Sequence, residues 1–276
     1  MDLHVTIQGQ GYPILCLHGH PGSGHSLSVF TDHLSQRFLT ISPDLRGYGK
    51  SRYQNQFEML DHLTDLINLL DNQKIEKCLL LGWSLGGILA LELVLRYPKR
   101  FTGLILIASA ARPWSNHPRV TSQALIYAGI AGVLNYFNPG WQWNIETFGK
   151  RSLFRYLIGQ QTSLAYQYLA KYGVKAYLKT SKQANKALSN ALKSGYNRLD
   201  DLPQIEIPCL VLAGSEDRHI TAISSQETAK KISNSHYICY PDTAHLFPWE
   251  IPQQVLTDID SWLAKNCTIS HFSLNS

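Results

Sequence analysis

The chain has 276 residues, of which 44% are hydrophobic, and its formal net charge is +5. This length suits one α/β domain that carries an insertion, and the apolar fraction is sufficient for a large core. Because no run of about 18 apolar residues occurs, we expect no transmembrane helix. The N-terminus also lacks the basic and apolar regions of a signal peptide, so none is expected.

The five cysteines are odd in number and scattered along the chain. Cys16, Cys78, Cys209 and Cys239 lie inside strand-like apolar runs, where a cysteine is usually a small core residue. This usage argues against a disulfide framework and indicates a reducing compartment. We therefore expect a cytoplasmic protein.

The positive charge is concentrated in one stretch. Residues 112–199 contain 12 Lys or Arg and a single acid, Glu146, which gives +11, whereas the remainder carries −6. The change of sign marks a module boundary and favours an acidic partner for the basic part. No nucleic-acid-binding motif accompanies it, so nucleic acid is not expected. An anionic lipid surface and a basic face that meets only solvent stay open as alternatives.

In chain order, short apolar runs alternate with helical patterns. Strands are expected at residues 4–7, 13–17, 39–43, 78–81, 104–107, 209–213 and 236–240. Helices are expected at residues 26–38, 57–70, 88–96, 221–232 and 252–265, and a loosely held tail from Cys267. This alternation predicts an α/β fold with a mostly parallel sheet covered by helices on both faces.

One stretch interrupts the alternation. Residues 119–134 and 151–193 have helical patterns, aromatic residues recur, and no strand-like run stands out. We therefore predict a core formed by residues 1–111 and 201–276, with residues 112–200 inserted as a helical cap, or lid.

A strand-length apolar run leads directly into Gly82-Trp83-Ser84-Leu85-Gly86, and a helical pattern follows. Strand, glycine-flanked serine and helix form the context of a nucleophile elbow, in which glycines are needed because side chains would clash at the turn. The helix N-terminus offers free N–H groups that suit a developing oxyanion. Ser84 is the predicted nucleophile.

A serine hydroxyl needs a general base, and the base needs an orienting acid. Asp217 follows the expected strand 209–213, and His245 follows the expected strand 236–240. Because parallel strands present such groups at their carboxyl ends, Asp217 and His245 are the candidates. Glu216 is a rival for the acid.

The glycine-rich loop after strand 13–17 allows the backbone to approach a ligand closely. It has the sequence His18-Gly19-His20-Pro21-Gly22, and the backbone N–H of His20 is the candidate second oxyanion donor. His18 is expected to support the loop by hydrogen bonds, as are Asp44 and Arg46. The side chains of His20 and Trp83 are candidates for lining the substrate cleft. No metal-ligand spacing occurs, so neither a metal nor another cofactor is expected.

These motifs together resemble the α/β-hydrolase superfamily across nearly the whole chain outside residues 112–200. The matching features are the His18 loop, Asp44-x-Arg46-Gly47-x-Gly49-x-Ser51, the elbow, Gly214-x-x-Asp217 and the late His245. The resemblance implies Ser84 as nucleophile, His245 as base and Asp217 as orienting acid. It also implies an oxyanion hole formed by the N–H groups of His20 and Leu85, with Leu85 beside the substrate, and hydrolysis of a carboxylic ester through an acyl-enzyme.

The six residues from Gly82 to Gly87 resemble those of the pimeloyl-carrier-protein methyl ester esterases, although that family favours Trp where this chain has His20. This likeness implies an alternative substrate, a carrier-linked methyl ester or thioester, with an acidic acyl carrier protein at the basic cap. The same apparatus also serves carbon–carbon bond hydrolysis, elimination and hydrolase-like small-molecule receptors. These alternatives stay open from the sequence.

Overall fold

The computed structural model describes residues 1–266, so the expected loose tail from Cys267 lies outside the described residues. A seven-stranded sheet with the order β1-β3-β2-β4-β5-β6-β7 forms the centre of this part of the chain. Only β1 runs antiparallel, against β3. The predicted fold class is therefore confirmed. The strands are β1 (Val5–Gln8), β2 (Pro13–Leu17), β3 (Leu39–Pro43), β4 (Cys78–Trp83), β5 (Phe101–Ile107), β6 (Cys209–Gly214) and β7 (Ser235–Tyr240).

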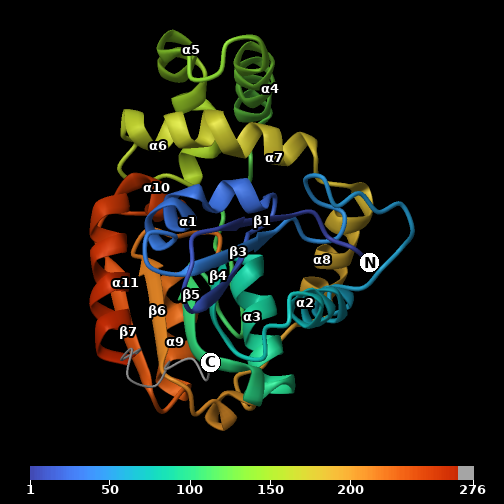
Figure 1. The fold of residues 1–276 in the computed structure, drawn as a ribbon. Coiled ribbons are helices and arrows are strands. Elements are labelled where there is room, and N and C mark those ends of the chain that lie inside the picture. Colours follow the sequence, from blue (N-terminus) through green and yellow to red (C-terminus); the bar gives the residue numbers. More distant parts are fainter. Residues whose placement is uncertain (267–276) are drawn as a thin grey trace.

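Helices cover both faces of the sheet (Figure 1), which divides the core into two clusters. The helices outside the stretch between β5 and β6 are α1 (Ser28–Leu34), α2 (Asp61–Asn72), α3 (Leu85–Arg96), α9 (Ala222–Lys231), α10 (Phe247–Glu250) and α11 (Pro252–Asn266). Helices α2, α3 and α9 pack on one face, and α1 and α11 on the other. The central strands are continuous apolar runs because both of their faces are buried.

Between β5 and β6 the chain forms helices and no strand. They are α4 (Ser122–Phe137), α5 (Gln142–Thr147), α6 (Ser163–Tyr168), α7 (Val174–Leu178) and α8 (Lys182–Lys193), with short 3₁₀ turns at Gly149–Arg151 and Leu153–Tyr156. Figure 1 shows α4 to α7 gathered at one end of the molecule.

The expected helix at 151–193 is broken into several pieces rather than continuous. Irregular backbone follows Tyr156, a π-helical turn at Leu169–Gly173 separates α6 from α7, and α8 begins after a new N-cap, Ser181. The Ser181 hydroxyl accepts a hydrogen bond from the backbone N–H of Ala184, which starts the helix again. Apolar periodicity continues across such interruptions and therefore conceals them.

One predicted core cysteine is exposed. Cys16, Cys78 and Cys209 lie buried in central strands, but Cys239 lies in β7 and is exposed. Side chains project from the faces of a sheet, and at the edge strand β7 the packed elements leave the face that carries Cys239 open to solvent. The position of a strand within the sheet decides this exposure, and the local sequence does not reveal it.

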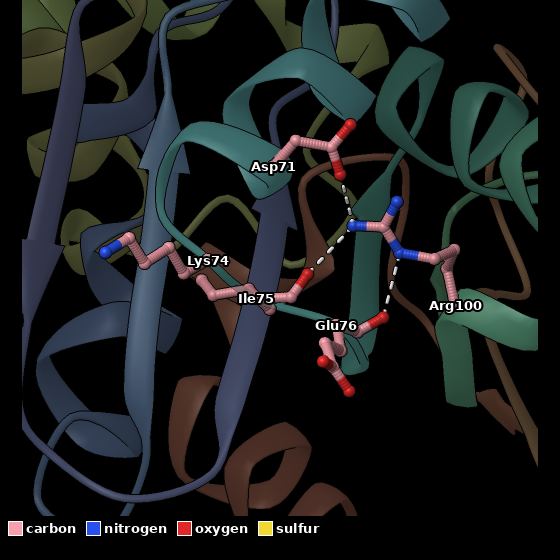
Figure 2. Close-up of a pocket in the computed structure, with 5 residues that line it drawn as sticks. All are labelled: Asp71, Lys74, Ile75, Glu76 and Arg100. Atoms are coloured by element: carbon pink, nitrogen blue, oxygen red, sulfur yellow. Dashed lines mark hydrogen bonds and ion pairs between the residues drawn. The ribbon is translucent and has the colours of Figure 1, made fainter.

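A hollow at the amino ends of the strands is lined by Asp71, Lys74, Ile75, Glu76 and Arg100, as Figure 2 shows. The guanidinium of Arg100 donates to the carbonyl oxygens of Ile75 and Glu76, each at 2.8 Å, and forms an ion pair with Asp71. These contacts tie the turn before β4 to the start of β5. The hollow is a structural junction, remote from the carboxyl ends of the strands where Ser84 lies.

Candidate active site

The turn between β4 and α3 places Ser84 in a conformation that few residues adopt. Ser84 has φ 55° and ψ −116°, and its N–H donates to the carbonyl oxygen of Ile107 at 2.9 Å. A Cβ on Gly86 would lie 2.1 Å from the carbonyl oxygen of Leu17, and one on Gly82 would lie 2.4 Å from the carbonyl oxygen of Gly86. The expected need for glycine on both sides of the serine is confirmed.

The structure brings Ser84, His245 and Asp217 into one hydrogen-bonded chain. Nε2 of His245 lies 3.1 Å from Oγ of Ser84, and Nδ1 of His245 lies 2.8 Å from Oδ2 of Asp217. All three side chains are buried. This arrangement allows the imidazole to accept the serine proton while the carboxylate fixes its orientation.

Backbone N–H groups close by in the sequence hold the carboxylate of Asp217, whereas Glu216, the alternative acid, is exposed. Oδ1 of Asp217 accepts hydrogen bonds from the backbone N–H groups of His219 (2.7 Å) and Ile220 (3.0 Å). These bonds leave Oδ2 free for His245. Glu216 is exposed and has no such contact, so the geometry favours Asp217 as the acid.

The ring of His219 lies edge-on to the ring of His245, with 4.7 Å between the centroids. Protein atoms packed around the ring, and then the neighbouring His245, lower the pKa of His219 from 6.5 to about 4, although the side chain keeps contact with solvent through the cavity that it lines. His219 is therefore neutral at pH 7 and can pack against the catalytic imidazole without repelling its charged form.

Hydrogen bonds fix the loops after β2 and β3, as expected for His18, Asp44 and Arg46. Nε2 of His18 accepts from the N–H of Leu45 at 3.0 Å, and Asp44 accepts from the N–H groups of Gly24 and Lys50, each at 2.8 Å. Arg46 holds the loop after β3 by a bidentate ion pair with the buried carboxylate of Asp65 in α2. These contacts stabilise the two loops beside the site.

The same loop lies directly against the nucleophile. A Cβ built on Gly19 would lie 3.1 Å from Cβ of Ser84, so a side chain there would crowd the nucleophile. Nδ1 of His20 lies 2.8 Å from the hydroxyl of Tyr48, and burial lowers the pKa of His20 to about 4. Leu85, which directly follows Ser84, is the first residue of α3, and an N–H at that position has no acceptor within the helix.

A cavity of about 420 Å³ opens above Ser84. Core residues form one wall, including His20, Leu85 and Ile88, and inserted residues form the other, including Leu188 and Leu192. The remaining lining residues are Ser84, Arg112, Pro113, Ser115, Gly195, Tyr196, Asn197, His219 and Ile220. The lining is mostly apolar near the nucleophile, which suits a hydrocarbon chain.

Of the expected lining residues, His20 and Leu85 contact this cavity, whereas Trp83 does not. The Trp83 indole is buried against Trp249 (5.1 Å between ring centroids) and Phe30 (6.1 Å). Its Nε1 donates to the carbonyl oxygen of His245 at 3.4 Å. Trp83 thus contacts the histidine loop from behind, because consecutive residues at the end of β4 point in opposite directions.

Sequence reasoning missed Glu250, which connects the insertion to the histidine loop. Its carboxylate accepts hydrogen bonds from the N–H groups of Gly159 (3.0 Å), Gln160 (2.7 Å) and Ala244 (3.0 Å). Burial raises the pKa of Glu250, and these three hydrogen bonds oppose that shift. A glutamate five residues after His245 gives no motif in the sequence, so no signal distinguishes it from a surface acid.

The fold and this geometry define a class of protein. The sequence profile described as "alpha/beta hydrolase fold" matches residues 12–252. The chain belongs to the alpha/beta hydrolase fold family, which confirms the recognition of that family and the predicted hydrolase class.

Particular relatives extend this result. The chain is 29% identical to the pimeloyl-[acyl-carrier protein] methyl ester esterase of Shewanella woodyi, over 96% of this chain and 98% of that one. It is 25% identical to the enzyme of the same name from Legionella pneumophila strain Corby, over 89% of this chain and 92% of that one. A thermophilic esterase from Thermogutta terrifontis shares the fold, with a TM-score of 0.70 at 24% identity over 95% of this chain and 93% of that one.

Proposed function

We propose that the protein is a serine esterase that hydrolyses carboxylic esters through an acyl-enzyme. The observation that carries this proposal is the hydrogen-bonded chain from Asp217 through His245 to Ser84 at the wall of an apolar cavity. A chain of nucleophile, base and orienting acid has the order of roles that acyl transfer requires.

In the proposed reaction, Oγ of Ser84 attacks the ester carbonyl carbon while Nε2 of His245 accepts the hydroxyl proton. The tetrahedral intermediate then collapses, the bond to the alcohol oxygen breaks, and His245 gives that oxygen the proton. Water attacks the acyl-enzyme with His245 again as base, which releases the carboxylic acid and restores Ser84. Asp217 stabilises the imidazolium in both steps without accepting its proton.

The N–H groups of His20 and Leu85 are the proposed donors to the oxyanion. Gly19 brings the backbone of the β2 loop within contact of Ser84, and Leu85 begins the helix behind the serine. Losing one such donor typically costs ~10²–10³ in rate. Proline at residue 85 would remove the Leu85 donor, but it would also force Ser84 out of its φ 55°, ψ −116° conformation, so it is no clean test of the oxyanion hole.

We further propose that residues 112–200 act as a lid on a core formed by residues 1–111 and 201–276. Leu188, Leu192 and Tyr196 from the insertion face Leu85 and Ile88 across the cavity. An acyl chain would lie between these two walls, with its reacting carbonyl at Ser84.

The four free cysteines of the described chain support a cytoplasmic location.

Hydrolysis of p-nitrophenyl esters across a series of acyl lengths tests this function, with the native chain beside Ser84→Ala. We expect serine-dependent release, reduced in the variant by on the order of 10⁴–10⁶, with a preference for the chain lengths that the cavity holds. Release that is equal in both proteins would contradict the assignment. Saturable binding of an ester without turnover would instead favour the receptor alternative.

A carrier-linked methyl ester is the substrate that the relatives favour. The two sequence relatives named above are pimeloyl-[acyl-carrier protein] methyl ester esterases, and bases lie near the cavity. Arg112 lines the cavity but is paired with Glu227 at 2.7 Å. The exposed bases Lys193 and Arg218 directly adjoin the lining residues Leu192 and His219 in the sequence, and neither forms an ion pair with a described residue. An acidic carrier at the mouth would present its tethered chain to Ser84.

The matched test uses Lys193→Glu with Arg218→Glu, two exposed positions. We expect the double variant to lose activity on a carrier-linked methyl ester and to retain activity on a short p-nitrophenyl ester. Added salt should weaken only the carrier reaction of the native chain. An equal loss on both substrates would reject the carrier and leave the general esterase unaffected.

A further inference from the structure

Helix α4 has its large apolar side chains on the outside. Its fully buried positions, Ala124, Ala131 and Asn135, are small or polar, and of its large side chains only Tyr127 and Leu134 are partly buried. The outward side chains are 38% to 79% exposed and belong to Leu125, Ile126, Ile130, Val133, Tyr136 and Phe137. The 16 residues of α4 include no charged residue. A helix on a protein surface normally shows the opposite arrangement.

Polar contacts on the inner side hold α4 in this orientation. Nδ2 of Asn135 donates to the carbonyl oxygen of Ala170 at 2.8 Å, and its Oδ1 accepts from the N–H of Gly140 at 3.0 Å. Nδ2 of Asn144 donates to the carbonyl oxygen of Ala131 at 3.0 Å. The helix cannot turn its large side chains inward without breaking these bonds, so their exposure is built into the fold.

Two exposed tryptophans continue this surface beyond the end of α4. Trp141 and Trp143 are 41% and 52% exposed, and their ring centroids lie 4.9 Å apart. With the six outward side chains of α4 they form what we call the α4 ridge. Tryptophan and tyrosine are enriched where a protein meets the interface between water and lipid, because their rings are apolar with one polar end.

The elements that pack against α4 add positive charge. They include the turn Gly149–Arg151, the turn Leu153–Tyr156 and α7. These carry the exposed bases Arg151, Arg155 and Lys175, none of which forms an ion pair with a described residue. The single acid of the surrounding stretch, Glu146, is already paired with Lys150 at 2.8 Å.

The charge around the α4 ridge and its position in the fold indicate which kind of partner could bind it. A second copy of the chain would bring another strongly basic stretch to the contact, and the like charges would repel. A carrier protein would have to sit at the mouth of the Ser84 cavity, and no residue of α4 lines that cavity. Figure 1 shows α4 at the top of the view, apart from α8, whose Leu192 lies at the cavity mouth.

We propose that the α4 ridge binds the surface of an anionic lipid bilayer and anchors the protein there as a peripheral protein. The apolar side chains enter the boundary between headgroups and acyl chains, the two tryptophans lie at that depth, and the bases contact anionic headgroups. Within residues 1–266, no helix has the length and apolarity needed to cross a bilayer. The helix therefore lies along the surface. This inference does not depend on the proposed esterase chemistry.

Co-sedimentation of the full chain with lipid vesicles tests the proposal. Vesicles of equal parts phosphatidylglycerol and phosphatidylcholine are compared with vesicles of phosphatidylcholine alone. We expect binding to the anionic vesicles, reduced about tenfold or more when Ile126→Ser, Val133→Ser and Phe137→Ser are combined. Reversing three charges with Arg151→Glu, Arg155→Glu and Lys175→Glu should have a similar effect, since each base near the surface contributes about fivefold in affinity.

The matched pair Ile126→Ser and Ile223→Ser separates the ridge from general surface apolarity. Ile126 is 59% exposed in α4, and Ile223 is 71% exposed in α9. Only Ile126→Ser should weaken vesicle binding, and unchanged thermal unfolding of both variants shows that the fold is intact. The fluorescence of Trp141 and Trp143 should shift to shorter wavelength with vesicles, and Trp141→Phe with Trp143→Phe should abolish that shift.

Three results would overturn the proposal. The first is an absence of binding to anionic vesicles, or equal binding to both vesicle types. The second is a dimer in solution that dissociates when the ridge is changed to serine, which would assign the ridge to a second copy. The third is displacement of the vesicles by an acidic carrier protein that protects α4 from hydrogen exchange, which would assign it to the carrier.

Discussion

Oε1 of Glu250 accepts a hydrogen bond from the backbone N–H of Ala244 at 3.0 Å, directly before His245 in the chain. Its other oxygen, Oε2, accepts from Gly159 and Gln160 in the insertion. The N–H of Leu246 also donates to the carbonyl oxygen of Leu157 at 2.9 Å. The histidine loop and one segment of the insertion are therefore held by a common buried carboxylate.

We expect Glu250→Gln to lower both stability and turnover. An amide has only one acceptor oxygen, so its NH₂ group must face an N–H group of Ala244, Gly159 or Gln160 that the carboxylate now accepts. Leaving a buried donor unpaired costs about 1–3 kcal/mol, measurable by urea unfolding. Turnover should fall while KM changes little, because His245 is displaced rather than the cavity. The exposed Glu206→Gln serves as control, and equal behaviour of the two variants would exclude a positioning role for Glu250.

Asp217→Asn should reduce ester turnover by about 10⁴-fold. The amide oxygen can still accept from the N–H groups of His219 and Ile220, which leaves NH₂ to face Nδ1 of His245. That contact selects the imidazole tautomer with a proton on Nε2, which cannot accept the proton of Ser84. Glu216→Gln is the matched control, and kcat is the measurement. A larger loss in Glu216→Gln than in Asp217→Asn would assign the acid to Glu216.

Gly86→Ala should disrupt the elbow, whereas Gly129→Ala should be tolerated. A Cβ on Gly86 would lie 2.1 Å from the carbonyl oxygen of Leu17, so the backbone beside Ser84 has to move. Such overpacking typically costs about 1–3 kcal/mol. At Gly129 in α4 nothing lies within 4 Å of the added Cβ, and alanine should stabilise the helix by up to about 1 kcal/mol. Thermal unfolding of the two variants should shift in opposite directions, and a shared direction would contradict the elbow geometry.

Buried histidines make the fold sensitive to acid. Burial lowers the pKa of His62 from 6.5 to about 3, and its ring lies against Phe57 and Tyr48. Between these two pKa values the unfolded chain binds more protons than the folded chain, so the stability present above pH 6.5 is lost as the pH falls. His62→Phe should reduce the loss between pH 6.5 and pH 5 by about 1.5 kcal/mol. Urea unfolding at both pH values measures this, and identical losses in the two proteins would show that His62 is not the group responsible.

The parts of the fold that the sequence revealed are those with local signals. The apolar runs that become β2, β4, β5 and β6 are continuous because both of their faces are buried. Ser84 could be found because the tight turn between strand and helix requires glycine at positions 82 and 86, and this leaves a recognisable pattern in the sequence. Asp217 and His245 could be found because the carboxyl ends of parallel strands lie at the same end of the sheet, and both residues follow such ends.

The remaining features depend on contacts between distant segments. Trp83 is the last residue of β4, and its side chain could face either the cavity or Trp249, so only tertiary packing decides. Apolar residues occur all around α4, so its sequence predicts a helix without indicating which face is exposed. Glu250 has no recognisable pattern because its partners lie in loops up to 91 residues away.

The positions of the three site residues along the chain also determine when the site can exist. Ser84 and His245 are separated by 161 residues, and β7, which precedes His245, is the last strand of the sheet. A growing polypeptide can pair β2, β4 and β5 long before its base and acid have been synthesised. In a growing chain, the proposed reaction therefore begins only after β7 and the segment that carries His245 have joined the sheet.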